Sequence, residues 1–260
     1  MVGYRDFEKE MESCGTQSNE NHQEIDACDD KDYRHPSPKR NKCLIAVFRI
    51  LAYGASVDST DEYVRIDEST TILCMKKFCR TIVEVFGDEY LRTPNANDVA
   101  RLQKKGEERG FLGILGSLDC MHWAWKNCPT AWMGQYSGCH GSPTIILEAV
   151  TSYDLWIWHA YFGLPGSNND INVLQSSNLV ANLAQGIAPL AHYTIQDTKY
   201  NVGYYLADGK WSSLVQIIFQ PQDRKKQYFA MMQEAYWKDV ERAFGVLQSR
   251  FAIVKGPACF

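Results

Sequence analysis

The feature that most constrains the fold is a series of short, nearly continuous apolar runs between residues 111 and 208. FLGILGSLD comes first, PTIILEAVT and LWIWHAYFG flank a tight turn at residues 152–154, and GYYLAD follows a helical stretch. Runs of this length and composition, bounded by turn residues, are typical of strands buried on both faces. The order strand, hairpin, helix, strand predicts an α/β protein with flanking helices, in which a right-handed crossover sets the last strand parallel to the first.

The first and last of these runs each end in an aspartate, Asp119 and Asp208. At the ends of neighbouring parallel strands the two carboxylates would lie side by side, and they would repel each other unless a cation separated them. Oxygen ligands without paired cysteines or histidines suit Mg²⁺ or Mn²⁺, which accept one or two protein carboxylates and keep several waters. The sequence therefore predicts a divalent-metal site at this edge of the sheet.

A third acid lies in a predicted helix over residues 238–251. Its apolar positions recur at steps of four, three and four residues: Val240, Phe244, Leu247 and Phe251. Glu241 is on the shoulder of this apolar face, where a carboxylate is costly unless a charge meets it. A metal ion bound by Asp119 and Asp208 could also bind the carboxylate of Glu241. Three acids of this kind can complete a two-metal site.

The pattern from Cys43 to Phe86 is helical, and a charged connector follows it up to residue 110. Two short helices and a turn precede a long helix that begins at a Ser69 cap, which is the order of a helix-turn-helix unit. The last helix of such a unit can lie in a major groove, and here it carries Lys76, Lys77 and Arg80 as candidate DNA contacts. The alternative is an ordinary helical bundle with a solvated basic face.

Charge is divided unevenly along the chain, whose formal net charge is −4. Residues 1–40 hold ten acids against six bases, which already amounts to −4, so the remainder is neutral. A polar, acidic opening with few large apolar residues predicts a disordered tail over residues 1–41. Because the chain has no run of eighteen apolar residues and no signal-peptide pattern at its start, we expect a soluble intracellular protein without membrane contact.

The chain contains nine cysteines, an odd number in a sequence without a secretory signal. This indicates reduced thiols packed as small hydrophobic groups rather than a disulfide framework. Five cysteines and histidines between residues 120 and 140 lack the paired spacing that a zinc site requires.

Four strings carry a resemblance to a known family: LGSLDCMHWAWKNCPTAWMGQY, PTIILEAVTSYDLWIWHAYFGLPGSNNDINVL, YYLADG and KDVERAFGVLQSRFAIVKGP. From about Lys42 onward the chain resembles the plant-transposon branch of the PIF/Harbinger superfamily of DDE transposases and the nuclease-like proteins derived from them. The resemblance implies an RNase H-like nuclease domain with a mixed sheet over residues 111–260. It also implies a helix-turn-helix-like segment with its connector over residues 42–110.

Carried over by position, the resemblance implies that Asp119 is the first metal-binding acid and Glu241 the last. The middle acid is either Asp208 or Asp170, since both match family acids. Topology favours Asp208, which ends a strand, whereas Asp170 could cap the helix that follows it. His122 is interpreted either as a residue that orients a metal ligand or as an ordinary histidine beside a buried strand.

The resemblance implies a divalent-metal-dependent DNA endonuclease or strand-transfer enzyme that acts in the nucleus. Its expected partners are DNA and a Myb-like DNA-binding protein, and self-association is one option. Two departures predict impaired cleavage. KWSSLVQII follows LADG without the family's usual Tyr-Pro pair, and the chain ends soon after the acidic helix, so that the nuclease domain is expected to be C-terminally truncated. The alternative function is a non-catalytic DNA- or protein-binding derivative.

Overall fold

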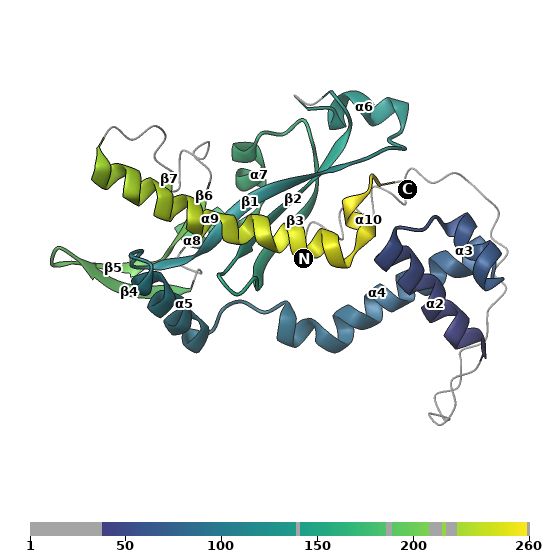
Figure 1. Ribbon diagram of the computed structural model, residues 1–260, viewed down its shortest axis with the longest axis horizontal. Helices are drawn as coiled ribbons and strands as arrows, with labels where there is room; N and C mark the ends of the chain where they lie inside the picture. The colour runs from purple at the N-terminus through teal and green to yellow at the C-terminus, as the bar shows by residue number, and fades with distance from the viewer. Residues whose placement is uncertain (1–37, 139–140, 186–188, 208–214, 217–222, 259–260) are drawn as a thin grey trace. The chain divides into compact units, whose positions relative to one another are not determined.

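The computed structural model describes residues 38–138, 141–185, 189–207, 215–216 and 223–258 (Figure 1). The chain divides into two compact units, Met1–Val85 and Phe86–Phe260. Most of the predicted acidic tail lies outside the described residues, but residues 38–41 form the first turn of a helix. None of the helices in the described part of the chain is long and apolar enough to cross a membrane.

From residue 38 onward, where the structure describes it, the first unit contains three helices in the order that the sequence predicts. These are α2 (Pro38–Tyr53), α3 (Val57–Val64) and α4 (Glu68–Tyr90), the last of which continues into the second unit. Ser56 caps α3, and Arg65 ends it in the left-handed conformation with φ of 59°. Only three residues separate α3 from α4, a connection as short as the turn of a helix-turn-helix unit.

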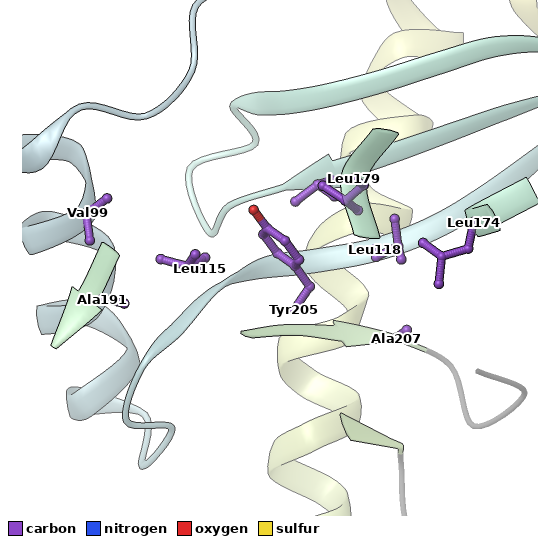
Figure 2. Packing of buried hydrophobic residues seen from close by; sticks show 9 residues of the cluster. Val99, Leu115, Leu118, Leu174, Leu179, Ala191, Tyr205 and Ala207 are labelled. Carbon is purple, nitrogen blue, oxygen red and sulfur yellow. The ribbon is translucent and has the colours of Figure 1, made fainter. Parts of the chain in front are cut away.

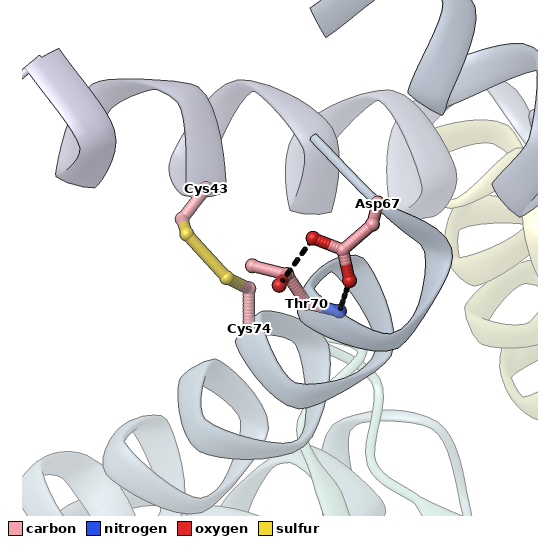
Figure 3. Close-up of a disulfide and its surroundings, with 4 residues drawn as sticks. All are labelled: Cys43, Asp67, Thr70 and Cys74. Carbon is pink, nitrogen blue, oxygen red and sulfur yellow. Dashed lines mark hydrogen bonds between the residues drawn. A yellow bond between two sulfur atoms is a disulfide. The ribbon is translucent and has the colours of Figure 1, made fainter. Parts of the chain in front are cut away.

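The side chain of Asp67 caps the start of α4 (Figure 3). Its carboxylate accepts hydrogen bonds from the amide of Thr70 at 3.0 Å, from the hydroxyl of Thr70 at 2.8 Å and from the hydroxyl of Ser69. The predicted cap, Ser69, is therefore wrong by two positions, because the side chain that accepts the bond from Thr70 is an aspartate just before the helix. These bonds, the Ser69 hydroxyl first and then the Thr70 hydroxyl and amide, lower the pKa of Asp67 to about 2.

A disulfide joins α2 to α4 between Cys43 and Cys74 (Figure 3). Their Cα atoms are 5.7 Å apart, within the range that a disulfide spans. The expectation of reduced thiols is therefore wrong for this pair, since the packing of two helices brings together cysteines that are 31 positions apart in the sequence.

The second unit is built on a five-stranded mixed sheet in the order β3-β2-β1-β6-β7. Its strands are β1 (Ile114–Ala124), β2 (Thr144–Thr151), β3 (Ile157–Pro165), β6 (Tyr204–Ala207) and β7 (Val215–Gln216). β1 and β2 are antiparallel, as are β2 and β3, whereas β1 and β6 are parallel neighbours. The predicted α/β class, the hairpin and the parallel pairing of the first and last runs are confirmed.

Helices cover both faces of this sheet. The remaining elements are α5 (Ala96–Glu108), α6 (Thr130–Tyr136), α7 (Asp170–Ser176), α8 (Asn178–Ala184), β4 (Leu190–Ile195), β5 (Thr198–Val202), α9 (Arg224–Arg250) and α10 (Ala252–Lys255). On one face, Leu115 and Leu118 of β1 pack with Val99 of α5, Leu174 of α7 and Leu179 of α8 (Figure 2). We call this the α7 face, and the opposite side, which packs against α9, the α9 face.

On the α9 face, two clusters join the helix to the strands. Ile114 and Leu206 pack with Tyr236, and Ala149 packs with Val240 and Phe244. Because α9 contacts β1, β2 and β6, it crosses the centre of the sheet. The connector helix α5 also packs on β1, so residues that the sequence grouped with the helical segment lie with the sheet.

The hairpin of β4 and β5 is an element that the sequence interpretation missed. It follows α8 and precedes β6 along the chain, and it forms a separate two-stranded sheet. Its turn residues Gln196 and Asp197 both have positive φ, 48° and 64°. Neither residue belongs to the Asn-Gly or Asp-Gly pairs that usually mark such a turn, so the sequence carried no strong signal for it.

Candidate metal and nucleic-acid site

Asp119 lies on the face of β1 that is turned toward α9. Side chains alternate along a strand, so Asp119 shares its face with Ser117 and Met121. The Ser117 hydroxyl donates to the backbone oxygen of Tyr236 at 2.9 Å, and the Gln248 amide lies 3.3 Å from the Met121 sulfur. Both neighbours of Asp119 on this face therefore contact α9, one on each side of the aspartate.

The cross-strand partner of Asp119 shows which part of α9 is opposite. Asp119 pairs with Ala149 of β2, and Ala149 packs with Val240 and Phe244. Glu241 is the next residue after Val240, so it is carried by the turn of α9 that packs at the level of Asp119. The structure thus places two of the predicted acids on the same side of the sheet and at the same level.

Glu241 itself is exposed, at the edge of the buried stripe of α9. Trp237, one turn earlier, packs with residues of both α9-face clusters, and Gln248, two turns later, contacts Met121. Residues at these spacings lie along one flank of a helix. Glu241 therefore projects from the flank of α9 that borders β1 and β6, with its carboxylate accessible to solvent.

Asp208 lies outside the described residues, but β6, the strand that precedes it, is a direct neighbour of β1. β6 ends at Ala207, which pairs in parallel with Leu118, the residue before Asp119. The sequence predicted this parallel pairing, but β1 does not end at Asp119 as expected, since it continues to Ala124.

Asp170 is the first residue of α7, which packs on the opposite face of the sheet from α9. The cap of this helix is Asn169, whose side chain accepts from the amide of Asn172 at 2.8 Å. The suggestion that Asp170 caps the helix is therefore wrong by one residue. Its helix and the helix of Glu241 cover different faces of the sheet.

His122 also belongs to the other face. It is three residues from Asp119 in the same strand, and an odd separation turns the two side chains in opposite directions. Its Nδ1 lies 3.1 Å from the hydroxyl of Thr144 on β2. The structure does not bring His122 together with the Asp119 side chain.

The donor set can be compared with the metals that the sequence suggests. No group of three or more histidine, cysteine, aspartate or glutamate side chains that could hold a metal occurs among the residues that the structure describes. Asp119 and Glu241 are two carboxylates at one level, and Asp208 is outside this part of the chain. Oxygen donors of this kind fit Mg²⁺ or Mn²⁺ rather than zinc.

The candidate DNA contacts of the first unit lie together on α4. Lys76, Lys77 and Arg80 are all exposed, and their spacing of one and four residues puts them on one side of the helix. They follow the capped start of α4 by two to three turns. This is a basic face on the helix that occupies the recognition position of a helix-turn-helix order.

Two buried ionic groups were not identified as such from the sequence. Asp239 on α9 bonds to Arg109 and Arg242, and Glu148 on β2 lies 3.0 Å from Nε2 of His159 on β3. The sequence did contain a signal for Glu148, because it is the single charged residue in the apolar run TIILEAVT and a buried position there requires a partner. The sequence carried no comparable signal for Asp239, which meets an arginine 130 positions away.

These observations define a mixed α/β protein of transposon origin when they are set beside known proteins. A family model described as plant transposon protein matches residues 88–260. The match covers more than half of the chain, which therefore belongs to the plant transposon protein family. Comparisons with curated proteins and with solved structures gave no match.

Proposed function

We propose that this protein is a divalent-metal-dependent DNA endonuclease or strand-transfer protein of the PIF/Harbinger DDE type, with an RNase H-like sheet. The observation that carries the proposal is the position of Glu241 on α9, at the same level of the sheet as Asp119. The two strands at this level are β1, which bears Asp119, and β6, which leads to Asp208. Membership of the plant transposon protein family supports it. We assign Asp208 rather than Asp170 as the middle acid, because α7 covers the other face of the sheet.

In this proposal Asp119, Asp208 and Glu241 hold Mg²⁺ or Mn²⁺ through carboxylate oxygens. Bound metal would activate water or a DNA 3′-hydroxyl and stabilise the charge that develops on the phosphate. The chain's own contribution is positional. β1 fixes Asp119 between two residues that contact α9, and α9 presents Glu241 from a helix flank that is anchored by Trp237 and Gln248.

The first unit would supply affinity for DNA. Lys76, Lys77 and Arg80 would contact phosphates from α4, so their removal should weaken binding to all sequences alike. A chain with net charge −4 gains little from long-range attraction to DNA, which is consistent with recruitment by a Myb-like partner. A protein of this activity would act in the nucleus.

Calorimetry with Mn²⁺ tests the proposal directly. Asp119→Asn and Glu241→Gln should each weaken binding strongly, whereas Glu234→Gln, an exposed change on the same helix, should leave it unchanged. The same variants should lower nicking of plasmid DNA in Mg²⁺, and we expect the wild type itself to cleave weakly, because the segment after Asp208 is short. Equal Mn²⁺ affinity in the wild type and Asp119→Asn would refute the metal site.

A further inference from the structure

A second candidate site lies on the outer side of α9, between this helix and the β2–β3 turn. It is a pocket of about 490 Å³. Its lining consists of Tyr153, Asp154, Leu155, Arg242, Gly245 and Val246. The pocket is built within the second unit and involves none of the three proposed metal ligands.

Cations surround the aromatic ring of this pocket. The charged groups of Arg101 and Lys105 lie 5.8 Å from the centroid of the Tyr153 ring, and that of Arg109 lies 6.0 Å from it. Arg101 also donates to the Tyr153 hydroxyl at 3.2 Å. Together with Arg242 in the lining, four cationic side chains from α5 and α9 converge on one turn of the sheet.

Of the two carboxylates bonded to these cations, Asp239 is buried, whereas the side chain of Asp154 is 32% exposed. Asp239, which bonds to Arg109 and Arg242, is 1% exposed, whereas Arg242 is 57% exposed. Asp154 accepts from Arg101 at 2.5 Å and also from Ser152. Burial acts to raise the pKa of Asp154, but the hydrogen bonds from Ser152 and Arg101 outweigh it and lower the pKa.

The pocket lining therefore presents one guanidinium group, that of Arg242, and one carboxylate, that of Asp154, which is paired with Arg101. Arg242 uses part of its donor set on Asp239, and a guanidinium has five N–H donors, so others can serve an anion. Guanidinium groups match the geometry of phosphate oxygens. At Gly245 nothing lies within 4 Å of the position that a Cβ would occupy, so a ligand can approach the backbone there.

We propose that this pocket binds a phosphate of the DNA backbone and guides the strand across α9 toward the metal site, an inference that rests on the proposed function. Arg242 directly follows Glu241, and successive residues of a helix project about 100° apart. The pocket and the acid thus lie on adjacent flanks of one helical turn. Tyr153 offers a ring on which a sugar or base can pack beside the bound phosphate.

The test measures binding of a fluorescein-labelled DNA duplex by the full chain, in EDTA, over a range of salt concentrations. Arg242→Gln should reduce the slope of log affinity against log salt by about 0.9, the change expected for one lost phosphate contact. Lys226→Gln is the matched control, since Lys226 is an exposed cation 16 residues earlier on the same helix and should leave the slope unchanged.

A second pair of variants keeps the ion pairs intact. Val246 lines the pocket and is 44% exposed, so Val246→Glu adds a negative charge there without touching Asp239. We expect it to weaken DNA binding several-fold relative to Val246→Gln, which has nearly the same size. If the wild type binds DNA and both Arg242→Gln and Val246→Glu leave its affinity and salt slope unchanged, the pocket assignment is wrong and the metal site stands. If the wild type binds no DNA, both proposals fail.

Discussion

Asp239 of α9 is 1% exposed, and its Oδ2 lies 2.7 Å from Nη1 of Arg109 at the end of α5. The guanidinium of Arg109 also lies 4.9 Å from the centre of the Tyr236 ring. This ion pair joins the helix that carries Glu241 to the segment that leads into β1. Its position makes it a fixed point for the orientation of α9.

Replacement of Asp239 with alanine should lower the free energy of unfolding by about 3 kcal/mol, because the change leaves Arg109 without its buried counter-charge. Urea denaturation followed by circular dichroism would measure this loss. Glu234→Ala is the control, since it removes an exposed pair with Lys238 that should contribute little to stability. Similar losses in both variants would contradict a special role for Asp239.

His159→Phe should destabilise the protein by about 2 kcal/mol, because Glu148 is fully buried and would lose its hydrogen bond to the ring. The double variant Glu148→Leu, His159→Phe should recover most of that loss, since replacement of both partners removes the buried charge as well. Chemical denaturation of the two variants and the wild type distinguishes the outcomes. A double variant less stable than the single one would show that the pair is favourable in itself.

Loss of the Cys43–Cys74 disulfide should lower the stability of the first unit by about 3 to 4 kcal/mol, since it closes a loop of 31 positions. Thermal unfolding of Cys43→Ser, Cys74→Ser with and without a dithiol reductant would measure the effect. The reductant should destabilise the wild type and leave the double variant unchanged. Cys79→Ser, which alters an exposed thiol on the same helix, should behave as the wild type.

Acid should weaken the start of α4, because the pKa of Asp67 is lowered to about 2. A carboxyl with a lowered pKa stabilises the folded state above its ordinary pKa of about 4, and that contribution is lost as the pH falls through about 2. The difference in stability between the wild type and Asp67→Asn should therefore be present at pH 7 and vanish near pH 2. Thr70→Val, which removes one hydroxyl bond, should show a smaller pH dependence.

Calorimetry can also identify the middle acid. Asp208→Asn should weaken Mn²⁺ binding by more than about tenfold. Loss of a residue that only hydrogen-bonds to a metal ligand already weakens metal binding by about that much, and we expect loss of a ligand itself to weaken it more. Asp170→Asn should have little effect, because α7 packs on the face opposite α9. The reverse result would assign Asp170 to the site.

Much of this fold follows from local patterns. The apolar runs predicted the strands, and the order of elements predicted that β6 lies parallel to β1. The predicted end of the first strand at Asp119 was wrong, because β1 continues to Ala124 through its pairing with β2. The spacing of apolar residues likewise predicted the C-terminal half of α9 and the burial of Val240 and Phe244. The prediction was wrong for Phe251, which lies just beyond the end of α9 and is 41% exposed. These features could be predicted because strand and helix periodicities depend on neighbours within a few residues.

Only the tertiary structure decided which distant groups meet. Arg109 and Asp239 are 130 positions apart, and Cys43 meets Cys74 because two helices pack together. The β4–β5 hairpin, the pairing of Glu148 with His159 and the placement of α7 and α9 on opposite faces of the sheet also required the assembled fold. Such contacts depend on where whole elements pack, and the residues involved carry no periodic signal of their partners.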